Sequence, residues 1–443
     1  MSREADVPNQ DGDSDHAKAQ PWSSYVGEVF LNRKPPLVPA SFHKLESAAR
    51  EAMAHSPEAF EYISAGAGTG STLEANREEF RKWRIIPQVL NDVRTRSLET
   101  TLFGVKYPSP LIVAPMGLQS IVHADGECAT AEAAGKVGVP FCMSTASSRS
   151  IEAIAKANGT GPRWFMLYWG KEEEVTLSLL ARAKRGGFTA LVMMVDGLMH
   201  GYRSSDLDTA YFPVVHAVGM EVGLSDPAFM GKLGLEPFPE DVRPAFPYDP
   251  RAQDELVRKG DAGAVRRAQC ALSFLERIID TGKTWDDVAF LRQHWDGPIV
   301  LKGILSVKDA ERAIDCGVEG IGVSNHGGRQ IDGAIPSLRA LRKIVQSPKV
   351  KAAQPEESGR FTVLMDSGIR RSGSDVFKAI ASGAQGILYG RPVLYSLAVG
   401  GAAGVESQLR DVLSEFDTTL GLSGFTNVED LRRHGDEILE RDP

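Results

Sequence analysis

Residues 361–392 read FTVLMDSGIRRSGSDVFKAIASGAQGILYGRP. An apolar run over 361–366 ends at an aspartate, a helix-like stretch follows over 374–383, and a second apolar run covers 386–390. Short runs that are apolar at nearly every position are typical of strands buried on both faces of a parallel sheet. This stretch therefore predicts a strand, a helix and a second strand parallel to the first.

The same strand–helix unit recurs from about residue 110 to 390. Helical patterns such as GECATAEAAGKVG, KEEEVTLSLLARAKRGG and SLRALRKIV separate the apolar runs. Repeated units of this kind predict an α/β fold in which the strands close into a (β/α)₈ TIM barrel, and a doubly wound open sheet is the alternative. The runs are LIVAP (111–115), VPFCMS (139–144), RWFMLY (163–168), ALVMMVD (190–196), PIVLK (298–302), GIGVSN (320–325), FTVLMD (361–366) and GILYG (386–390).

Three parts of the chain lie outside this repeat. Residues 1–21 are polar and acidic without the apolar centre of a signal peptide, which predicts a disordered tail ahead of a single barrel domain at 22–443. An N-terminal helical segment containing FHKLESAAREAMA precedes the first strand. Residues 197–284 follow the fourth strand, and so long a connection is usually functional or disordered. We expect 197–284 to form a lid over the catalytic mouth, and a surface insertion without a role is the alternative.

The bulk composition excludes several classes of partner. The 443-residue chain has a formal net charge of −8, which argues against a nucleic-acid partner but is compatible with a local basic pocket. Its four cysteines form no CxxC pair, as is typical of reduced thiols in a cytosolic protein. No apolar run reaches the ~18 residues of a membrane span. We therefore expect a cytoplasmic protein that binds neither nucleic acid, nor a membrane, nor a metal.

Polar residues at the ends of the predicted strands are candidates for one shared site, because the C-terminal ends of barrel strands meet at one face and carry the chemistry there. Asp196 ends the fourth run, Lys302 ends the fifth, and His326 follows the sixth. Arg203 and Arg329 come shortly afterwards. Each alone is commonly a helix cap or a structural group, but a base, a carboxylate, a lysine and two arginines together predict an anion-binding acid/base site.

Two glycine-rich turns follow the last two predicted strands, DSGIRR (366–371) and YGRP (389–392). Many barrels bind a phosphate at this place through backbone N–H groups and a helix N-terminus. Turn geometry alone would explain the glycines, but it explains the neighbouring Arg370 and Arg391 less well. These turns therefore predict a phosphate site.

The segment SNHGGRQID (324–332) resembles the signature of the FMN-dependent α-hydroxy acid oxidases and dehydrogenases, the group of glycolate oxidase and lactate oxidase. Supporting matches are PIVLKG, VDGLMHGYR, LIVAPMGLQ, FEYISAGAG and most of 361–392. The similarity runs in order from about residue 40 to 430, with the long insertion as its main interruption. The resemblance implies FMN as the cofactor, a small 2-hydroxy acid and O₂ as partners, and a homotetramer or homo-octamer.

The resemblance also implies a role for each matched residue. His326 would be the catalytic base, and Asp196 would pair with it and stabilise the imidazolium that forms. Arg203 and Arg329 would hold the substrate carboxylate, since a guanidinium offers a bidentate fork. The tyrosines that would hydrogen-bond the substrate's carboxylate and hydroxyl are Tyr62 and Tyr168.

A second group of matched residues would hold the flavin. Lys302 would lie by its N1–C2=O edge and stabilise negative charge there. The main chain of Pro115, Met116 and Gly117 would lie against the face that carries the reactive N5 atom. The residues that would contact the rest of the cofactor are Ser144, Ser324, Asp366, Gly368, Arg370, Gly390 and Arg391.

Three positions depart from the family pattern. Met166 and Met194 occupy cofactor-binding positions where the family usually has glutamine and threonine, and methionine is at best a weak acceptor. Backbone groups or water would then have to bond the pyrimidine edge of the flavin. Gly117 stands where oxidases commonly have alanine, and we expect it to leave space near N5. Glycine there, the long insertion and an N-terminal arm like WSSYVGEVF are shared with the lactate 2-monooxygenases.

Three functions follow as hypotheses. The first is FMN-dependent oxidation of an L-2-hydroxy acid with O₂ and oxidative decarboxylation, as in a lactate 2-monooxygenase. The second is a plain oxidase or dehydrogenase that releases the keto acid, with H₂O₂ where O₂ is the acceptor. The third is a flavin-binding protein that has lost turnover through the two methionines, and the intact His326, Asp196, Arg203 and Arg329 argue against it.

Overall fold

A closed barrel of eight parallel strands forms the centre of the computed structural model, which describes residues 21–354, 361–370 and 372–442. All eight predicted strands are present, so the TIM-barrel prediction is confirmed and the open sheet is wrong. The barrel closes because the last strand pairs with the first, Ile387 opposite Leu111. The strands are β4 (Leu111–Val113), β5 (Phe141–Ser144), β6 (Arg163–Leu167), β7 (Ala190–Met194), β8 (Ile299–Ile304), β9 (Gly320–Val323), β10 (Thr362–Met365) and β11 (Gly386–Tyr389).

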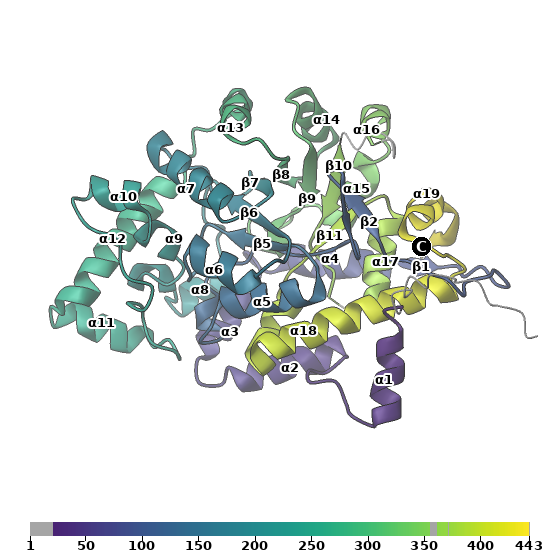
Figure 1. Ribbon diagram of the computed structural model, residues 1–443, viewed down its shortest axis with the longest axis horizontal. Coiled ribbons are helices and arrows are strands. Elements are labelled where there is room, and N and C mark those ends of the chain that lie inside the picture. Colours follow the sequence, from purple (N-terminus) through teal and green to yellow (C-terminus); the bar gives the residue numbers. More distant parts are fainter. Residues whose placement is uncertain (1–20, 355–360, 371, 443) are drawn as a thin grey trace, which may run out of the picture.

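A ring of helices covers the outside of the barrel (Figure 1). Nearly every strand residue is buried, because these helices cover one face and the barrel interior fills the other. Several helices begin at a side-chain cap, as when Ser150 accepts from the Ala153 N–H at 3.1 Å. The helices are α5 (Glu127–Val137), α6 (Ile151–Asn158), α7 (Glu173–Arg185), α13 (Val288–His294), α14 (Val307–Asp315), α15 (Ser337–Ile344), α16 (Pro348–Ala353), α17 (Gly373–Ala381), α18 (Arg391–Leu422, kinked at Gly400 and Gly401) and α19 (Val428–Ile438).

The segments at the two ends of the chain extend the barrel. The hairpin of β2 (Thr100–Leu102) and β3 (Val105–Tyr107) closes the N-terminal end of the barrel. There the centre of the Phe103 ring lies 5.6 Å from the centre of the Trp164 ring. The expected N-terminal helical stretch is present, and the expected tail lies outside the described residues except for Pro21. The remaining N-terminal elements are α1 (Ser24–Asn32), α2 (Phe42–Ala52), α3 (Pro57–Ser64), α4 (Ser71–Arg81) and β1 (Trp83–Ile85), which pairs with β12 (Leu439–Arg441).

The long connection after β7 is folded into helices that group at one end of the molecule (Figure 1). A buried ion pair, Glu221 with Arg267 at 2.9 Å, joins two of these helices. The Glu221 N–H also donates to Ser147 O at 3.1 Å, so the insertion contacts the loop after β5. The elements between β7 and α13 are α8 (Ser204–Asp208), η2 (Pro213–His216), α9 (Glu221–Leu224), α10 (Pro227–Lys232), α11 (Pro250–Arg258), α12 (Ala262–Ile278) and η3 (Trp285–Asp287).

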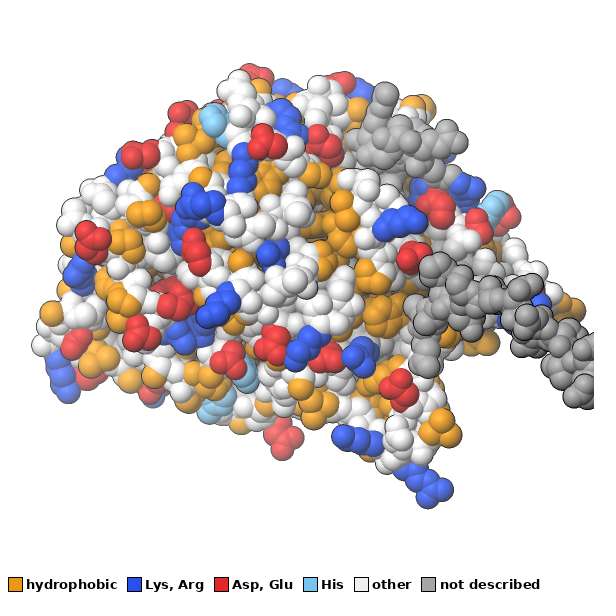
Figure 2. Space-filling view, in the orientation of Figure 1, with side chains coloured by type: hydrophobic (Ala, Val, Ile, Leu, Met, Phe, Trp, Pro, Cys, Tyr) orange, Lys and Arg blue, Asp and Glu red, His pale blue; other side chains and the backbone are white. Residues whose placement is uncertain are grey.

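The molecular surface carries charges of both signs. On the face shown in Figure 2, lysine and arginine side chains are interspersed with aspartate and glutamate. No helix within the described residues is both long and apolar enough to cross a membrane. The four cysteines are free thiols; Cys142 and Cys270 are buried, and Cys128 and Cys316 are partly exposed.

Candidate active site

A cavity opens at the C-terminal ends of the barrel strands and encloses about 1050 Å³ up to its open mouth. Most residues predicted from the sequence meet here, although they come from distant parts of the chain. Those lining the cavity are Tyr62, Pro115, Met116, Gly117, Ser144, Tyr168, Met194, Arg203, Lys302, His326, Arg329, Asp366, Gly368, Arg370, Gly390 and Arg391.

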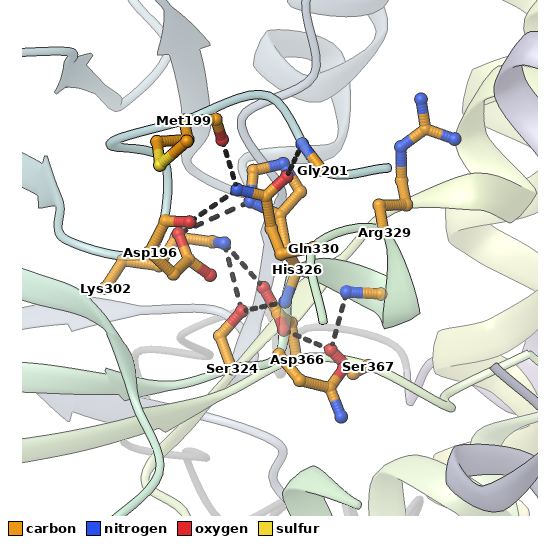
Figure 3. A network of polar contacts seen from close by, with 12 residues as sticks. Asp196, Met199, Gly201, Lys302, Ser324, His326, Arg329, Gln330, Asp366 and Ser367 are labelled. Carbon is orange, nitrogen blue, oxygen red and sulfur yellow. Dashed lines mark hydrogen bonds and ion pairs between the residues drawn. The ribbon is translucent and has the colours of Figure 1, made fainter. Parts of the chain in front are cut away.

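His326 and Asp196 form a pair at one side of the cavity (Figure 3). The Nδ1 atom of His326 lies 3.3 Å from Oδ1 of Asp196, although the two residues follow different strands. Asp196 itself lies behind the ring and does not line the cavity. The backbone of His326 is held in the left-handed region at φ 60°, a conformation that typically costs a non-glycine residue about 1–3 kcal/mol. Its N–H donates to Ser324 Oγ at 3.0 Å, which helps to hold this turn.

The electrostatics of the pair favour a neutral ring beside a charged carboxylate. Burial lowers the pKa of His326. Asp196 raises it, the positive charges of Lys302 and Arg203 lower it, and the net shift is downward. Burial would raise the pKa of Asp196, but Lys302 and the His326 ring outweigh burial and lower that pKa. His326 is therefore set up to accept a proton, and Asp196 to balance the charge that results.

Lys302 reaches into the cavity from β8 at an irregularity in the strand. Its Nζ lies 3.2 Å from Oδ2 of Asp366 and donates to Ser324 Oγ at 3.0 Å. Burial lowers the pKa of Lys302, but the carboxylates of Asp366 and Asp196 outweigh burial and raise it, so the ammonium stays charged. Gly303 follows at φ 118°, and a Cβ there would lie 2.6 Å from Cβ of Asp196. A glycine is therefore required where β8 passes Asp196.

Two arginines and a tyrosine form the opposite wall. The guanidinium carbons of Arg203 and Arg329 lie 5.9 Å and 5.2 Å from the centre of the Tyr62 ring. Arg329 Nη1 donates to Tyr62 O at 2.7 Å, and Arg203 Nε donates to Arg329 O at 3.2 Å. Burial and the charge of Arg203 lower the pKa of Arg329 to about 10. Burial raises the pKa of Tyr168 to about 12, so its hydroxyl stays protonated.

The two glycine-rich turns place further positive charge deeper in the cavity. Arg391 is fixed by donating to the carbonyls of Ile63, Ala65 and Gly327 at 2.8–3.0 Å. Arg370 differs, because its buried Nη1 and Nη2 atoms have no hydrogen-bond partner among the described residues. A buried guanidinium without partners is costly unless an anion binds it. The residues present therefore fit a phosphate group.

Met166 and Gly117 lie differently from the other predicted site residues. Met166 does not line the cavity; its side chain is buried in the barrel interior, in one cluster with Trp164 and the cavity-lining Met194. Gly117 does line the cavity, but a Cβ there would lie 2.2 Å from Ala146 O. An alanine at 117 would thus press on the main chain of the neighbouring loop, so the glycine is required by that contact and does not open space in the cavity.

Sequence reasoning missed several residues that hold the site together. Asp332 accepts hydrogen bonds from the N–H and hydroxyl groups of Thr69 and Ser71, which fixes the start of α4. Asn325 and Asn76 exchange side-chain hydrogen bonds at 2.8 and 2.9 Å. Asn325 and Asp332 lie inside the quoted motif at 324–332, so the motif itself pointed to them. The other missed residues are Ser367, which contacts Asp366, Asp206, which faces Arg203 at 3.7 Å, and Gln330.

Comparison with known proteins agrees with this geometry. The model of a family described as FMN-dependent dehydrogenase matches residues 49–437. The chain is 42% identical over 417 residues to an FMN-dependent alpha-hydroxy acid dehydrogenase of Penicillium citrinum, which covers 93% of this chain and 95% of that protein. It is 36% identical to an L-lactate oxidase of Lysinibacillus sphaericus, over 89% of this chain and 92% of that protein.

A solved structure extends the likeness to three dimensions. The crystal structure of mandelate oxidase with 3,3-difluoro-2-hydroxy-3-phenylpropionic acid matches with a TM-score of 0.70 at 35% identity, covering 91% of this chain and 100% of that chain. The unpartnered guanidinium of Arg370 fits the phosphate of FMN, the cofactor named for the family. The chain belongs to the FMN-dependent dehydrogenase family and is an FMN-dependent 2-hydroxy acid oxidoreductase.

Proposed function

We propose that this enzyme oxidises the α-carbon of a small L-2-hydroxy acid to a 2-keto acid, that O₂ takes up the electrons, and that both keto acid and H₂O₂ are released. The observation that carries the proposal is that His326, paired with Asp196, lines the same cavity as Arg203 and Arg329. A base and an anion-binding wall on one cavity suit a substrate whose hydroxyl is next to its carboxylate.

The two arginines hold the substrate. Arg203 and Arg329 bind its carboxylate through charge-assisted hydrogen bonds, and both guanidinium groups lie near the Tyr62 ring. Tyr168 and Tyr62 donate to the remaining oxygens of the substrate. This arrangement directs the substrate's hydroxyl toward His326.

His326 then acts as the base. Its ring takes the proton of the substrate hydroxyl, and the resulting imidazolium is balanced by Asp196 at 3.3 Å. The lowered pKa of His326 keeps the ring neutral and ready before the substrate binds. FMN, when bound, supplies the two-electron acceptor for this oxidation.

The residues that would hold FMN lie around the rest of the cavity. Arg370 and Arg391 would bind its phosphate, and Lys302 would lie at the flavin ring as a fixed positive charge. Met194 lines the cavity and pairs with Lys302 across β7 and β8, so it would contact the ring without a polar hydrogen bond. The other contacts would come from Pro115, Met116, Ser144, Asp366, Gly368 and Gly390. Ser324 is buried and does not line the cavity; it would act through Lys302, whose Nζ donates to its Oγ at 3.0 Å.

Release of the keto acid is favoured over its decarboxylation. One argument for decarboxylation was free space at Gly117, and it is weakened because a Cβ there would lie 2.2 Å from Ala146 O. The long insertion and the N-terminal arm are the other features shared with the monooxygenases. The relatives reported above are named as dehydrogenases and oxidases. The insertion at 197–284 remains a proposed lid. The proposal is supported by its Tyr211, whose ring centre lies 5.9 Å from that of the cavity-lining Tyr62.

The test is a panel of L- and D-2-hydroxy acids in air without catalase. We expect L-acids to reduce the flavin anaerobically, and each turnover in air to give one keto acid and one H₂O₂. Recovery of the one-carbon-shorter acid and CO₂ in place of these products would establish the decarboxylating reaction. Absence of flavin reduction by every acid would refute the proposed function.

A further inference from the structure

Gln330 lies between the two loops that carry the charged groups of the site. The loop after β7 carries Asp196 and Arg203, and the loop after β9 carries His326 and Arg329. In Figure 3 the Gln330 amide overlaps the His326 ring in projection, and dashed lines join it to the main chain of the first loop. None of the roles given above is assigned to this side chain.

One amide group satisfies three main-chain groups of the loop after β7. Gln330 Nε2 donates to Asp196 O at 2.5 Å and to Met199 O at 2.9 Å. Its Oε1 accepts from the Gly201 N–H at 3.2 Å. Two donors and one acceptor are needed at this place, and a side-chain amide supplies both kinds.

The loop after β7 also packs directly against the main chain at Arg329, next to Gln330. A Cβ at position 201 would lie 2.2 Å from Arg329 O, so only glycine permits this approach. Arg203 Nε donates to the same carbonyl at 3.2 Å. Gln330 therefore holds the stretch that joins Asp196 to Arg203, and a shift of that stretch would move both side chains.

The other side of Gln330 is firmly anchored. Two residues further on, Asp332 accepts four hydrogen bonds from Thr69 and Ser71. At the start of the same loop, Asn325 is bound to Asn76 of α4 and accepts from the Gly328 N–H at 3.1 Å. The loop after β9 is thus a fixed reference against which Gln330 can place the loop after β7.

We propose that Gln330 is a positioning residue. It holds Asp196 in place beside His326, and it holds Arg203 in place to bind the substrate carboxylate. This role rests on the proposed function of that site. A side chain that merely stabilised the loop would change the melting temperature and leave proton transfer and carboxylate binding alone. If Gln330 is a positioning residue, its replacement should impair proton transfer and carboxylate binding together.

The test compares Gln330→Met with Gln354→Met. Methionine has about the same length as glutamine but no hydrogen-bond donor. Gln354 is the matched control, because its Nε2 donates to Gln385 Oε1 at 2.8 Å next to the N-terminal end of β11. We expect Gln330→Met to slow flavin reduction by roughly 10- to 100-fold, since small misplacements of reacting groups have effects of this size. The dissociation constant of a 2-keto acid, measured by calorimetry, should rise about 2- to 10-fold, the equivalent of one neutral hydrogen bond.

The pH profile separates positioning from stability. The charge of Asp196 raises the pKa of His326, so a displaced Asp196 should move the acid limb of flavin reduction to lower pH in Gln330→Met only.

If that variant does not fold, Gln330→Asn, which keeps the amide but is one methylene shorter, carries the same expectation. A Gln330 variant that matches Gln354→Met in rate, dissociation constant and pH limb overturns the positioning role alone. Wild-type enzyme that no 2-hydroxy acid reduces overturns the proposed function itself.

Discussion

His326 can act as a base only while its ring is neutral, and two opposing influences set that state. Burial and nearby positive charges lower its pKa, whereas Asp196 raises it. Asp196 thus makes the resting base slightly easier to protonate, but it also stabilises the imidazolium that forms during the reaction. The same carboxylate should therefore affect the rate and the pH dependence in separable ways.

Replacing Asp196 with asparagine tests this balance. The variant keeps the shape of the side chain and removes its charge, so the pKa of His326 should fall and the acid limb of kcat/KM should move to lower pH. The plateau rate should drop by roughly 10²-fold or more, because the imidazolium loses its counter-charge. Stopped-flow flavin reduction across pH measures both effects. A limb that moves to higher pH would contradict the assigned pairing.

Arg370 offers a second residue-scale prediction, because its buried Nη atoms lack partners. If they bind the cofactor phosphate, Arg370→Gln should weaken FMN binding by roughly 10- to 100-fold, the equivalent of hydrogen bonds to a charged group. Riboflavin, which lacks the phosphate, should bind wild type and variant equally well. Fluorescence titration of the apoprotein with each flavin measures the ratio. An equal loss of riboflavin affinity would mean that Arg370 supports the fold of the site and does not recognise the phosphate.

At this scale the sequence predicted residue types well and supporting contacts poorly. Lys302, His326 and Arg329 could be found because they follow apolar strands or lie in a known motif. Gln330 and Asn325 lie in the same motif, yet their roles depend on main-chain groups from other loops, which no local pattern reveals.

Elements were predictable where they are regular. Every barrel strand is an apolar run, because burial on both faces demands one. The insertion was not resolved into helices, because its prolines, glycines and phenylalanines break helical periodicity. Apart from α12, its helices are short, and their stability depends on tertiary contacts such as the Glu221–Arg267 pair. The break in β8 at Gly303 was missed because its cause, the approach of Asp196, comes from another strand.

Packing between the loops after β4 and β5 gives an element-scale prediction. Gly117→Ala would place a methyl carbon 2.2 Å from Ala146 O if nothing moved, so the loops must separate. We expect a loss of about 1–3 kcal/mol in the free energy of unfolding, as for other overpacked positions. The ratio of H₂O₂ to substrate consumed should stay unchanged. Urea denaturation and peroxide assays check the two parts, and a changed ratio at unchanged stability would restore the view that Gly117 provides space for the product.

The whole molecule brings the site together through closure of the barrel. β7, β8 and β9 adjoin one another, so Asp196, Lys302 and His326 meet although up to 130 positions separate them. A barrel of eight strand–helix units could be predicted from the repeat alone. The wall formed by Tyr62 could not, since α3 reaches the mouth only through contacts such as Arg391 with the carbonyls of Ile63 and Ala65.

The last prediction concerns assembly. Helix α1 has no buried residue and stands apart from the barrel beneath α18 (Figures 1 and 2). Its Phe30 and Leu31 are 74% and 87% exposed. Apolar side chains on a protruding helix are unfavourable in water and are commonly covered by another chain. The family resemblance implies a homotetramer or homo-octamer, and we expect its contacts to include α1. Light scattering should show a lower molar mass for the double variant Phe30→Asp, Leu31→Asp, whereas Leu272→Asp on α12 should keep the wild-type mass. Equal masses for all three proteins would exclude α1 from the interface.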